Sequence, residues 1–191
     1  MIRKIVVFGL FLTCSFTFAQ STPAAEGRHL SLWAGVEGST FNPDWGCTSE
    51  NPFTCWDHQL QGIAVFSDLN HIIGKVGVEG EARWLIWRGP GQGIKQSNYL
   101  GGPRYQVLGG RKYAVDVKFL AGGATFHLNN MWGGWSAFVP GITGAYRLTP
   151  KLLLRADYEY QMWPGFVGGP GHAHGLTPNG FSVGVSYRIL H

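Results

Sequence analysis

The feature that most constrains the fold is a strict two-residue alternation near the C-terminus, from Gly180 to Leu190. One set of alternate positions is apolar: Phe181, Val183, Val185, Tyr187 and Ile189. The other set is polar or small: Ser182, Gly184, Ser186 and Arg188. Only a β-strand converts a period of two into one apolar and one polar face. The pattern predicts a strand and leaves open whether its apolar face meets a protein core or lipid.

The same alternation recurs along the chain after residue 29 and predicts seven more strands. We place them at about Leu30–Ser39, Leu60–Phe66, Lys75–Ile86, Ser97–Leu108, Tyr113–Thr125, Trp135–Leu148 and Leu152–Met162. No helical periodicity appears in this part of the sequence. Pro140 lies inside the sixth strand, where it removes a ladder hydrogen bond and predicts a bulge or a strand end.

The connections between these strands alternate between long and short. The long ones are Asn42–His58, Gly89–Gln96, Asn129–Gly134 and Trp163–Asn179, and the short ones are Ser67–Asn70, Gly109-Gly110 and Thr149–Lys151. An even strand count with this alternation is typical of an up-and-down barrel, with the long loops at one rim and the tight turns at the other. The strands are also about as long as the ~9–11 residues that a tilted strand needs to cross a bilayer.

The first 19 residues are predicted to be a secretory signal peptide. Arg3 and Lys4 precede an apolar stretch, and Thr17-Phe18-Ala19 provides a small-x-small cleavage site. The apolar stretch is too short for a comfortable membrane anchor, and Thr13 before Cys14 disfavours a lipoprotein site. We therefore expect a signal peptide at residues 1–19 and a single barrel domain at residues 20–191.

Composition excludes two other classes of protein. Only 14% of the residues are charged and 29 are glycine, which suits a β-rich protein, and there is no run of ~20 apolar residues for a membrane helix. Removal of Arg3 and Lys4 leaves 13 basic and 11 acidic residues, a net charge of +2 without a basic cluster. Nucleic-acid binding therefore has no support.

The polar face of the predicted strands carries nearly all of the charge. It holds six acidic and five basic side chains, which are Glu37, Glu79, Glu81, Arg83, Asp116, Lys118, Arg147, Arg155, Asp157, Glu159 and Arg188. Glycine, serine and alanine separate them, as expected for the crowded inside of a narrow barrel. The apolar face carries aromatic side chains suited to membrane interfaces: Trp84, Tyr113, Tyr146, Tyr158, Tyr160 and Tyr187. This favours a barrel that faces lipid over a lipocalin-like soluble barrel.

The chain resembles the small eight-stranded outer-membrane β-barrel proteins, the broad OmpX- and OmpA-like family. Its last strand, Ser182-x-Gly184-x-x-Tyr187-x-Ile189, is similar to the family's C-terminal assembly signal, and Leu148–Lys151 followed by Arg155–Tyr158 is similar to the family's penultimate hairpin. The resemblance implies an all-β, eight-stranded antiparallel up-and-down transmembrane barrel in the outer membrane of a Gram-negative-type bacterium. It further implies outer-membrane lipid and the barrel-assembly machinery as partners.

The interior charges have two interpretations. Eight strands leave a bore only just wide enough for side chains, and nearly balanced acids and bases favour a plug of mutual salt bridges over a water-lined conducting path.

The remaining candidate sites lie in predicted loops or lack a motif. Cys47 and Cys55 are spaced for a small disulfide loop in an oxidising compartment. His172 and His174 form a His-x-His pair, which alone is a weak metal site. No motif joins His71, His127 and Ser136 into a hydrolase site. We expect no catalytic residue, no cofactor and no metal.

The sequence thus favours a non-enzymatic outer-membrane barrel with a structural or surface-interaction (adhesion-like) role, whose long loops contact an extracellular ligand. A narrow porin-like channel for small solutes and an outer-membrane lipid-modifying enzyme remain as alternatives.

Overall fold

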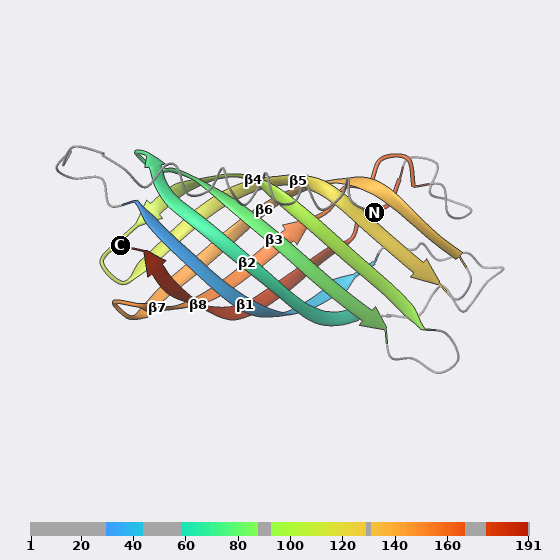
Figure 1. Cartoon of the computed structure of the whole chain (residues 1–191), viewed down its shortest axis with the longest axis horizontal. Coiled ribbons are helices and arrows are strands. Elements are labelled where there is room, and N and C mark those ends of the chain that lie inside the picture. The colour runs from blue at the N-terminus through green and yellow to red at the C-terminus, as the bar shows by residue number, and fades with distance from the viewer. Residues whose placement is uncertain (1–29, 44–58, 88–92, 129–130, 167–174, 191) are drawn as a thin grey trace, which may run out of the picture.

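The computed structural model describes residues 30–43, 59–87, 93–128, 131–166 and 175–190. These residues form eight antiparallel strands that close into a barrel in sequence order (Figure 1). The strands are β1 (Ser31–Asn42), β2 (Leu60–Ile73), β3 (Val76–Trp87), β4 (Ile94–Gly109), β5 (Tyr113–Leu128), β6 (Met131–Thr149), β7 (Leu152–Tyr160) and β8 (Asn179–Leu190). The predicted all-β, eight-stranded up-and-down barrel is confirmed.

The barrel closes through the pairing of its first and last strands. β1 and β8 run antiparallel from the pair Leu32–Leu190 at one end to the pair Asn42–Asn179 at the other. Inside this seam the hydroxyls of Ser39 and Ser182 are 2.8 Å apart. The sheet therefore has no free edge, which is the condition for a β-structure in lipid.

The distribution of side chains is inverted relative to a soluble protein. Among the described residues, 19 buried side chains are polar or charged and 15 are hydrophobic. The predicted outward positions of β1 and β8 expose their apolar side chains, with 56% for Val36, 57% for Val183 and 52% for Tyr187. A soluble monomer rarely exposes so continuous an apolar surface. The outer face of the barrel is a lipid-facing surface.

Exposed aromatic side chains lie near both ends of the barrel as well as along its middle. Tyr113 pairs with Tyr146, and Tyr187 pairs with Leu152, all close to the tight turns. Nearer the other rim, the indole nitrogen of Trp84 donates to the Tyr99 hydroxyl at 3.2 Å. Aromatic side chains near the two ends are characteristic of membrane barrels, where they mark the two interfaces with water.

The tight turns, the start of β1 and the end of β8 lie at the same end of the barrel, the left end in Figure 1. The ends of β1, β3 and β5, which precede residues 44–58, 88–92 and 129–130, lie at the opposite end. Among the described residues, no helix is long and apolar enough to cross a membrane.

The predicted turn at Ser67–Asn70 is wrong. β2 continues through these residues to Ile73, and the turn lies at Gly74 and Lys75, where Gly74 has a φ of +62°. The reason is a long-range interaction, because Asp68 points into the barrel and pairs with Arg104 and Arg155. The turn-like composition of this segment is overridden by that pairing.

The predicted long loop at Asn129–Gly134 is also wrong. β5 and β6 pair up to Leu128 and Met131, so only residues 129 and 130 lie between them. The Gly133-Gly134 pair is part of the β6 ladder rather than a loop. These two strands form the longest hairpin of the barrel.

Pro140 does not end β6, which pairs with β5 on both sides of it. Its effect is on the other neighbour. The continuous β6–β7 ladder stops at Gly141–Glu159 and pairing resumes at an isolated bridge between Phe138 and Met162. Proline has no N–H, so the hydrogen bond to β7 at this position is missing.

The glycines of the inner face provide room for the charged side chains. At the seam, Gly184 lies opposite Glu37, and a Cβ placed on Gly184 would lie 2.0 Å from the Val36 carbonyl oxygen and 2.7 Å from Glu37 Cγ. A Cβ on Gly38, on the outer side of the same seam, would have no neighbour closer than 3.9 Å. The alternation of small and large residues is thus a packing requirement of the bore.

We predict that Gly184→Val prevents or weakens closure of the barrel, whereas Gly38→Val is tolerated. Overpacking costs about 1–3 kcal/mol and more where backbone must move, as it must here. Heat-modifiability on a gel and urea unfolding of the refolded protein measure the effect. Equal stability of the two variants would show that the seam has space for a side chain at Gly184.

Candidate functional site

The centre of the bore is filled by a network of buried ion pairs. Four cations supply it: Arg83, Arg104, Lys118 and Arg155. Seven carboxylates surround them: Glu37, Asp68, Glu79, Glu81, Asp116, Asp157 and Glu159. All eleven side chains point inward because their positions alternate with the lipid-facing residues of the same strands.

Lys118 and Arg155 hold the network together. The Lys118 ammonium lies 2.7 Å from Glu159, 2.9 Å from both Glu79 and Asp157, and 3.6 Å from Glu81. The Arg155 guanidinium lies 2.5–2.9 Å from four carboxylates, which are Glu37, Asp68, Glu79 and Asp157. It also stacks on the ring of Phe66, 3.9 Å from the centroid. Each of these two cations therefore connects strands on opposite sides of the barrel.

Arg104 and Arg83 extend the network toward the two ends. Arg104 pairs with Asp68, with Asp116 at 2.6 Å and with Glu79 at 3.2 Å, on the side of the tight turns. Arg83 pairs with Glu159 at 2.6 Å and Glu81 at 2.9 Å, and its guanidinium lies over the Phe41 ring. Neither oxygen of Glu81 is in hydrogen-bonding geometry with a described donor.

A layer of amides separates the charges from an apolar plug. The Gln161 side-chain oxygen accepts hydrogen bonds from Asn98 at 2.9 Å and from the Trp163 indole at 3.2 Å. Gln96 lies at the same oxygen, at 3.5 Å. The amide side chains therefore lie between the ionic and the hydrophobic parts of the interior, and the buried Gln161 oxygen keeps its hydrogen-bond partners.

The apolar plug is formed by the chain that follows β7. Trp163 and Leu176 are joined by backbone hydrogen bonds that continue the β7–β8 pairing, and both side chains are 1% exposed. With Phe166 they pack on inward residues of β4, β5 and β6, among them Leu120 and Val139. Trp135 stacks against Trp163 with ring centroids 6.4 Å apart. The end of the bore nearest the long connections is therefore closed by hydrophobic side chains.

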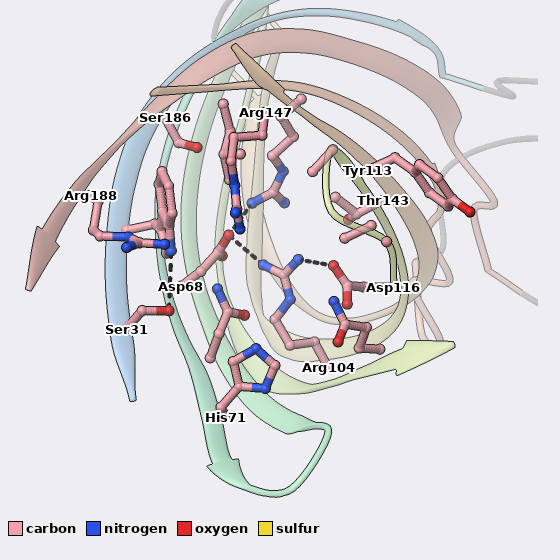
Figure 2. Close-up of a pocket in the computed structure, with 18 of the residues that line it drawn as sticks. Ser31, Asp68, His71, Arg104, Tyr113, Asp116, Thr143, Arg147, Ser186 and Arg188 are labelled. Carbon is pink, nitrogen blue, oxygen red and sulfur yellow. Dashed lines mark hydrogen bonds and ion pairs between the residues drawn. The ribbon is translucent and has the colours of Figure 1, made fainter. Parts of the chain in front are cut away.

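At the opposite end the bore opens into a cavity of about 390 Å³ (Figure 2). Its floor is the Arg104 and Arg155 side of the charge network. Its walls include Trp33, whose indole donates to the Ser31 hydroxyl at 3.2 Å, and Tyr113. The cavity is lined at its rim by residues of the tight turns, including Lys75 and Lys112.

The structure brings together nine of the eleven charged residues named from the sequence. Glu37, Glu79, Glu81, Arg83, Asp116, Lys118, Arg155, Asp157 and Glu159 are all buried and ion-paired. Arg147 is exposed at the mouth of the cavity, and Arg188 is half-buried there, with its guanidinium 4.7 Å from the Trp33 ring centroid.

Two members of the network were missed, Asp68 and Arg104. Asp68 lies in the segment assigned to a turn, and Arg104 follows Gly101-Gly102-Pro103, where the alternation is hard to follow. Their inclusion, with Arg147 and Arg188 at the mouth, changes the expected near-balance into seven acids and four bases. A continuous two-residue count from Gln96 and Asn98 would have placed Arg104 inside.

The other named residues fall into three places. Ser182 and Gly184 of the proposed assembly signal face inward, whereas Tyr187 and Ile189 are exposed on the outer face. Cys47, Cys55, His172 and His174 lie outside the described residues. His71 lines the cavity at the tight-turn end, and His127 is near the other end of the barrel on β5.

Comparisons with known proteins give a fold and no close relative. No protein-family model and no curated protein matches the sequence. Ail of Yersinia pestis, solved with the heparin analogue sucrose octasulfate, is 14% identical with a TM-score of 0.53, over 83% of this chain and 97% of Ail. OprG of Pseudomonas aeruginosa is 13% identical with a TM-score of 0.57, over 86% and 98%. Neisserial surface protein A is 13% identical with a TM-score of 0.51, over 83% and 96%.

These proteins are small bacterial outer-membrane β-barrels, and the present chain has their fold. Its own exposed apolar surface and buried charges agree with that assignment, because they are those of a barrel that crosses a membrane.

We predict that the network tolerates the loss of a carboxylate and not the loss of a cation. Arg155→Met leaves four buried carboxylates without their shared partner and lowers the free energy of unfolding by about 3–5 kcal/mol. Glu81→Gln removes one of the surplus negative charges at nearly constant volume, so stability stays equal or rises. Urea unfolding of the refolded barrel measures both.

The matched control is Arg147→Met, the same change at the exposed mouth, for which a surface-like effect within about 0.5 kcal/mol is expected. If Glu81→Gln is as destabilising as Arg155→Met, the excess of carboxylates over cations does not destabilise the barrel, and the prediction is wrong.

Proposed function

We propose that this protein is an outer-membrane barrel of a Gram-negative-type bacterium that serves as a closed, rigid scaffold for binding surfaces at the cell exterior. It is neither a conduit nor an enzyme in this proposal. The observation that carries it is the double closure of the bore, by an ion-pair network at its centre and by an apolar plug around Trp163 near the long connections.

Both closures oppose conduction, for different reasons. In the network, Lys118 and Arg155 each contact four carboxylates at 3.6 Å or less, so a passing ion would have to break several short contacts. In the plug, buried tryptophan, phenylalanine and leucine side chains exclude water from the bore. To conduct ions, the barrel would have to rearrange both the ion-pair network and the apolar plug.

An enzymatic role finds no support in the positions of the candidate residues. His71 lines the cavity at the tight-turn end, whereas His127 pairs with Trp132 and Lys95 near the opposite rim. Ser136 is exposed on β6, and it pairs with Gly123. These side chains cannot act on one substrate.

In membrane barrels of this type the long connections face the cell exterior. We therefore assign the binding surfaces to these connections. The sequence of the first, residues 44–58, contains two tryptophans, one proline and three acids, without a lysine or arginine. Such a segment favours aromatic and hydrogen-bonding contacts with a neutral or basic partner. A polysulfated ligand, such as the heparin analogue bound to Ail, is disfavoured by its charge.

We predict that the purified, refolded protein gives no stable conductance steps in planar lipid bilayers. A larger-bore porin reconstituted in the same way is the positive control. Reproducible ion-selective steps from the folded protein would exclude the closed-scaffold function and favour the narrow channel.

We further predict that replacement of residues 44–58 by a short Gly/Ser linker leaves a folded barrel and abolishes surface binding. The measurement is attachment of non-adherent bacteria that express the protein to a panel of immobilised matrix proteins and neutral or sulfated glycans. Lys151→Ala, in the tight turn at the opposite rim, is the control and should bind like the parent. Unchanged attachment after replacement of both 44–58 and 167–174 would contradict a loop-based role.

A further inference from the structure

The cavity at the tight-turn end carries an excess of positive charge that the proposed scaffold function does not explain. Six basic residues line it, which are Lys75, Arg104, Lys112, Arg147, Arg155 and Arg188. Only two carboxylates do so, Asp68 and Asp116, and both are already paired with Arg104 at the floor. The mouth is therefore positively charged above a floor that is neutralised.

Three of the cations around the opening are exposed and lack a carboxylate partner among the described residues. Lys75, Lys112 and Arg147 are exposed and form no ion pair of 4 Å or less with a described residue. Arg188 is held against the Trp33 ring, and the positive charge of Arg147 acts on it. Like charges gathered around one opening are stabilised by an anion between them.

The backbone under these cations is fixed. The Lys112 carbonyl accepts a hydrogen bond of 2.7 Å from the Arg147 N–H, which places the β4–β5 turn beside the end of β6. The Lys75 carbonyl accepts one of 3.0 Å from the Gln106 N–H. Figure 2 shows Arg147, Arg188 and Arg104 around the same space, with the Arg104 guanidinium between Asp68 and Asp116. These backbone hydrogen bonds hold the two turns that carry Lys75 and Lys112 against the neighbouring strands.

The floor offers a further donor. Arg104 is 5% exposed, and its Nε has no hydrogen-bond partner among the described residues. A buried donor without a partner carries a free-energy cost that a bound acceptor would remove. An oxygen-rich anion that enters the cavity meets flexible ammonium groups at the rim and guanidinium groups further in.

From this geometry we propose that the cavity binds a phosphate group. Phosphate fits because its several acceptor oxygens can be contacted at once by lysine and arginine from different strands. A volume of about 390 Å³ lies within the range of small-molecule sites and has room for the phosphate and part of the molecule that bears it. This goes beyond the proposed scaffold function and concerns the opposite end of the barrel.

The phosphate has two chemical sources, a soluble molecule or the headgroup of a neighbouring anionic phospholipid. Tyr113 lines the cavity and is 58% exposed at the aromatic level of the outer face, so the mouth lies at headgroup height. The two sources are separated by choice of probe.

The test uses the full-length mature protein refolded in a neutral maltoside detergent. Inorganic pyrophosphate is titrated as the soluble probe by calorimetry, and phosphatidylglycerol is compared with phosphatidylcholine in nanodiscs by NMR of the arginine and lysine side chains. Lys112→Ala and Arg147→Ala should each weaken binding by about tenfold, the loss of a charge-assisted hydrogen bond. Lys112→Glu should abolish it.

The controls are Arg111→Ala and Lys151→Ala, which remove the same charge from exposed turn residues outside the cavity lining. They should change affinity less than about twofold, the residual effect of screened distant charge. Binding of pyrophosphate identifies a soluble ligand, and a response to phosphatidylglycerol alone identifies the headgroup. The proposal is overturned if neither probe binds, or if Arg111→Ala weakens binding as much as Lys112→Ala. Heat-modifiability shows that each variant is folded.

Discussion

The hydrogen-bonded seam between β1 and β8 is the constraint on which the rest of the structure depends. A lipid-exposed sheet cannot leave backbone N–H and C=O groups unpaired, so the sheet has to close, and closure at eight strands fixes a narrow bore. Alternation along each strand then sends half of the side chains into that bore. The residues that cannot face lipid must be accommodated inside, in little space.

The chain meets this requirement with glycine opposite large polar side chains and with shared counter-charges. Glu37 fits because Gly184 lies opposite it, and Arg155 satisfies four carboxylates from several strands. Buried ion pairs seldom add much stability relative to hydrophobic packing, but their geometry is specific. In this barrel they fix the register of distant strands against one another, because a slip by one residue would expose these charges to lipid.

Much of the fold was predictable from the sequence, because a period of two is a local property. The strand count, the inward and outward faces, and the closure of the barrel all follow from it. The ends of the strands were not predictable in the same way. Ser67–Asn70 has the composition of a turn, and its extension into β2 depends on ion pairs of Asp68 with β4 and β7 residues.

The membership of the charge network was partly predictable for a related reason. Nine members of the network were predictable because their positions lie on the inward face of a strand. Arg147 and Arg188 also face inward, but they lie too close to the rim to be buried. Distance along the barrel axis depends on strand register, which the sequence does not specify locally. The positively charged mouth was not predictable either, because its cations come from two separate turns and from the ends of β6 and β8.

The unequal strand lengths give the barrel a lopsided rim. β5 and β6 have 16 and 19 residues, whereas β7 has nine. About 9–11 tilted residues suffice to cross the hydrocarbon layer. The β5–β6 hairpin is longer than this and therefore projects from one side of the rim. Trp132, near the tip of this hairpin, is 81% exposed. Beyond β7, isolated bridges join Met162 to Phe138 and Trp163 to Leu176, so the pairing on this side ends beside the middle of β6. A macromolecule that approached this rim would therefore find the β5–β6 hairpin higher than the β7–β8 side, and the hairpin would restrict the directions from which it could bind.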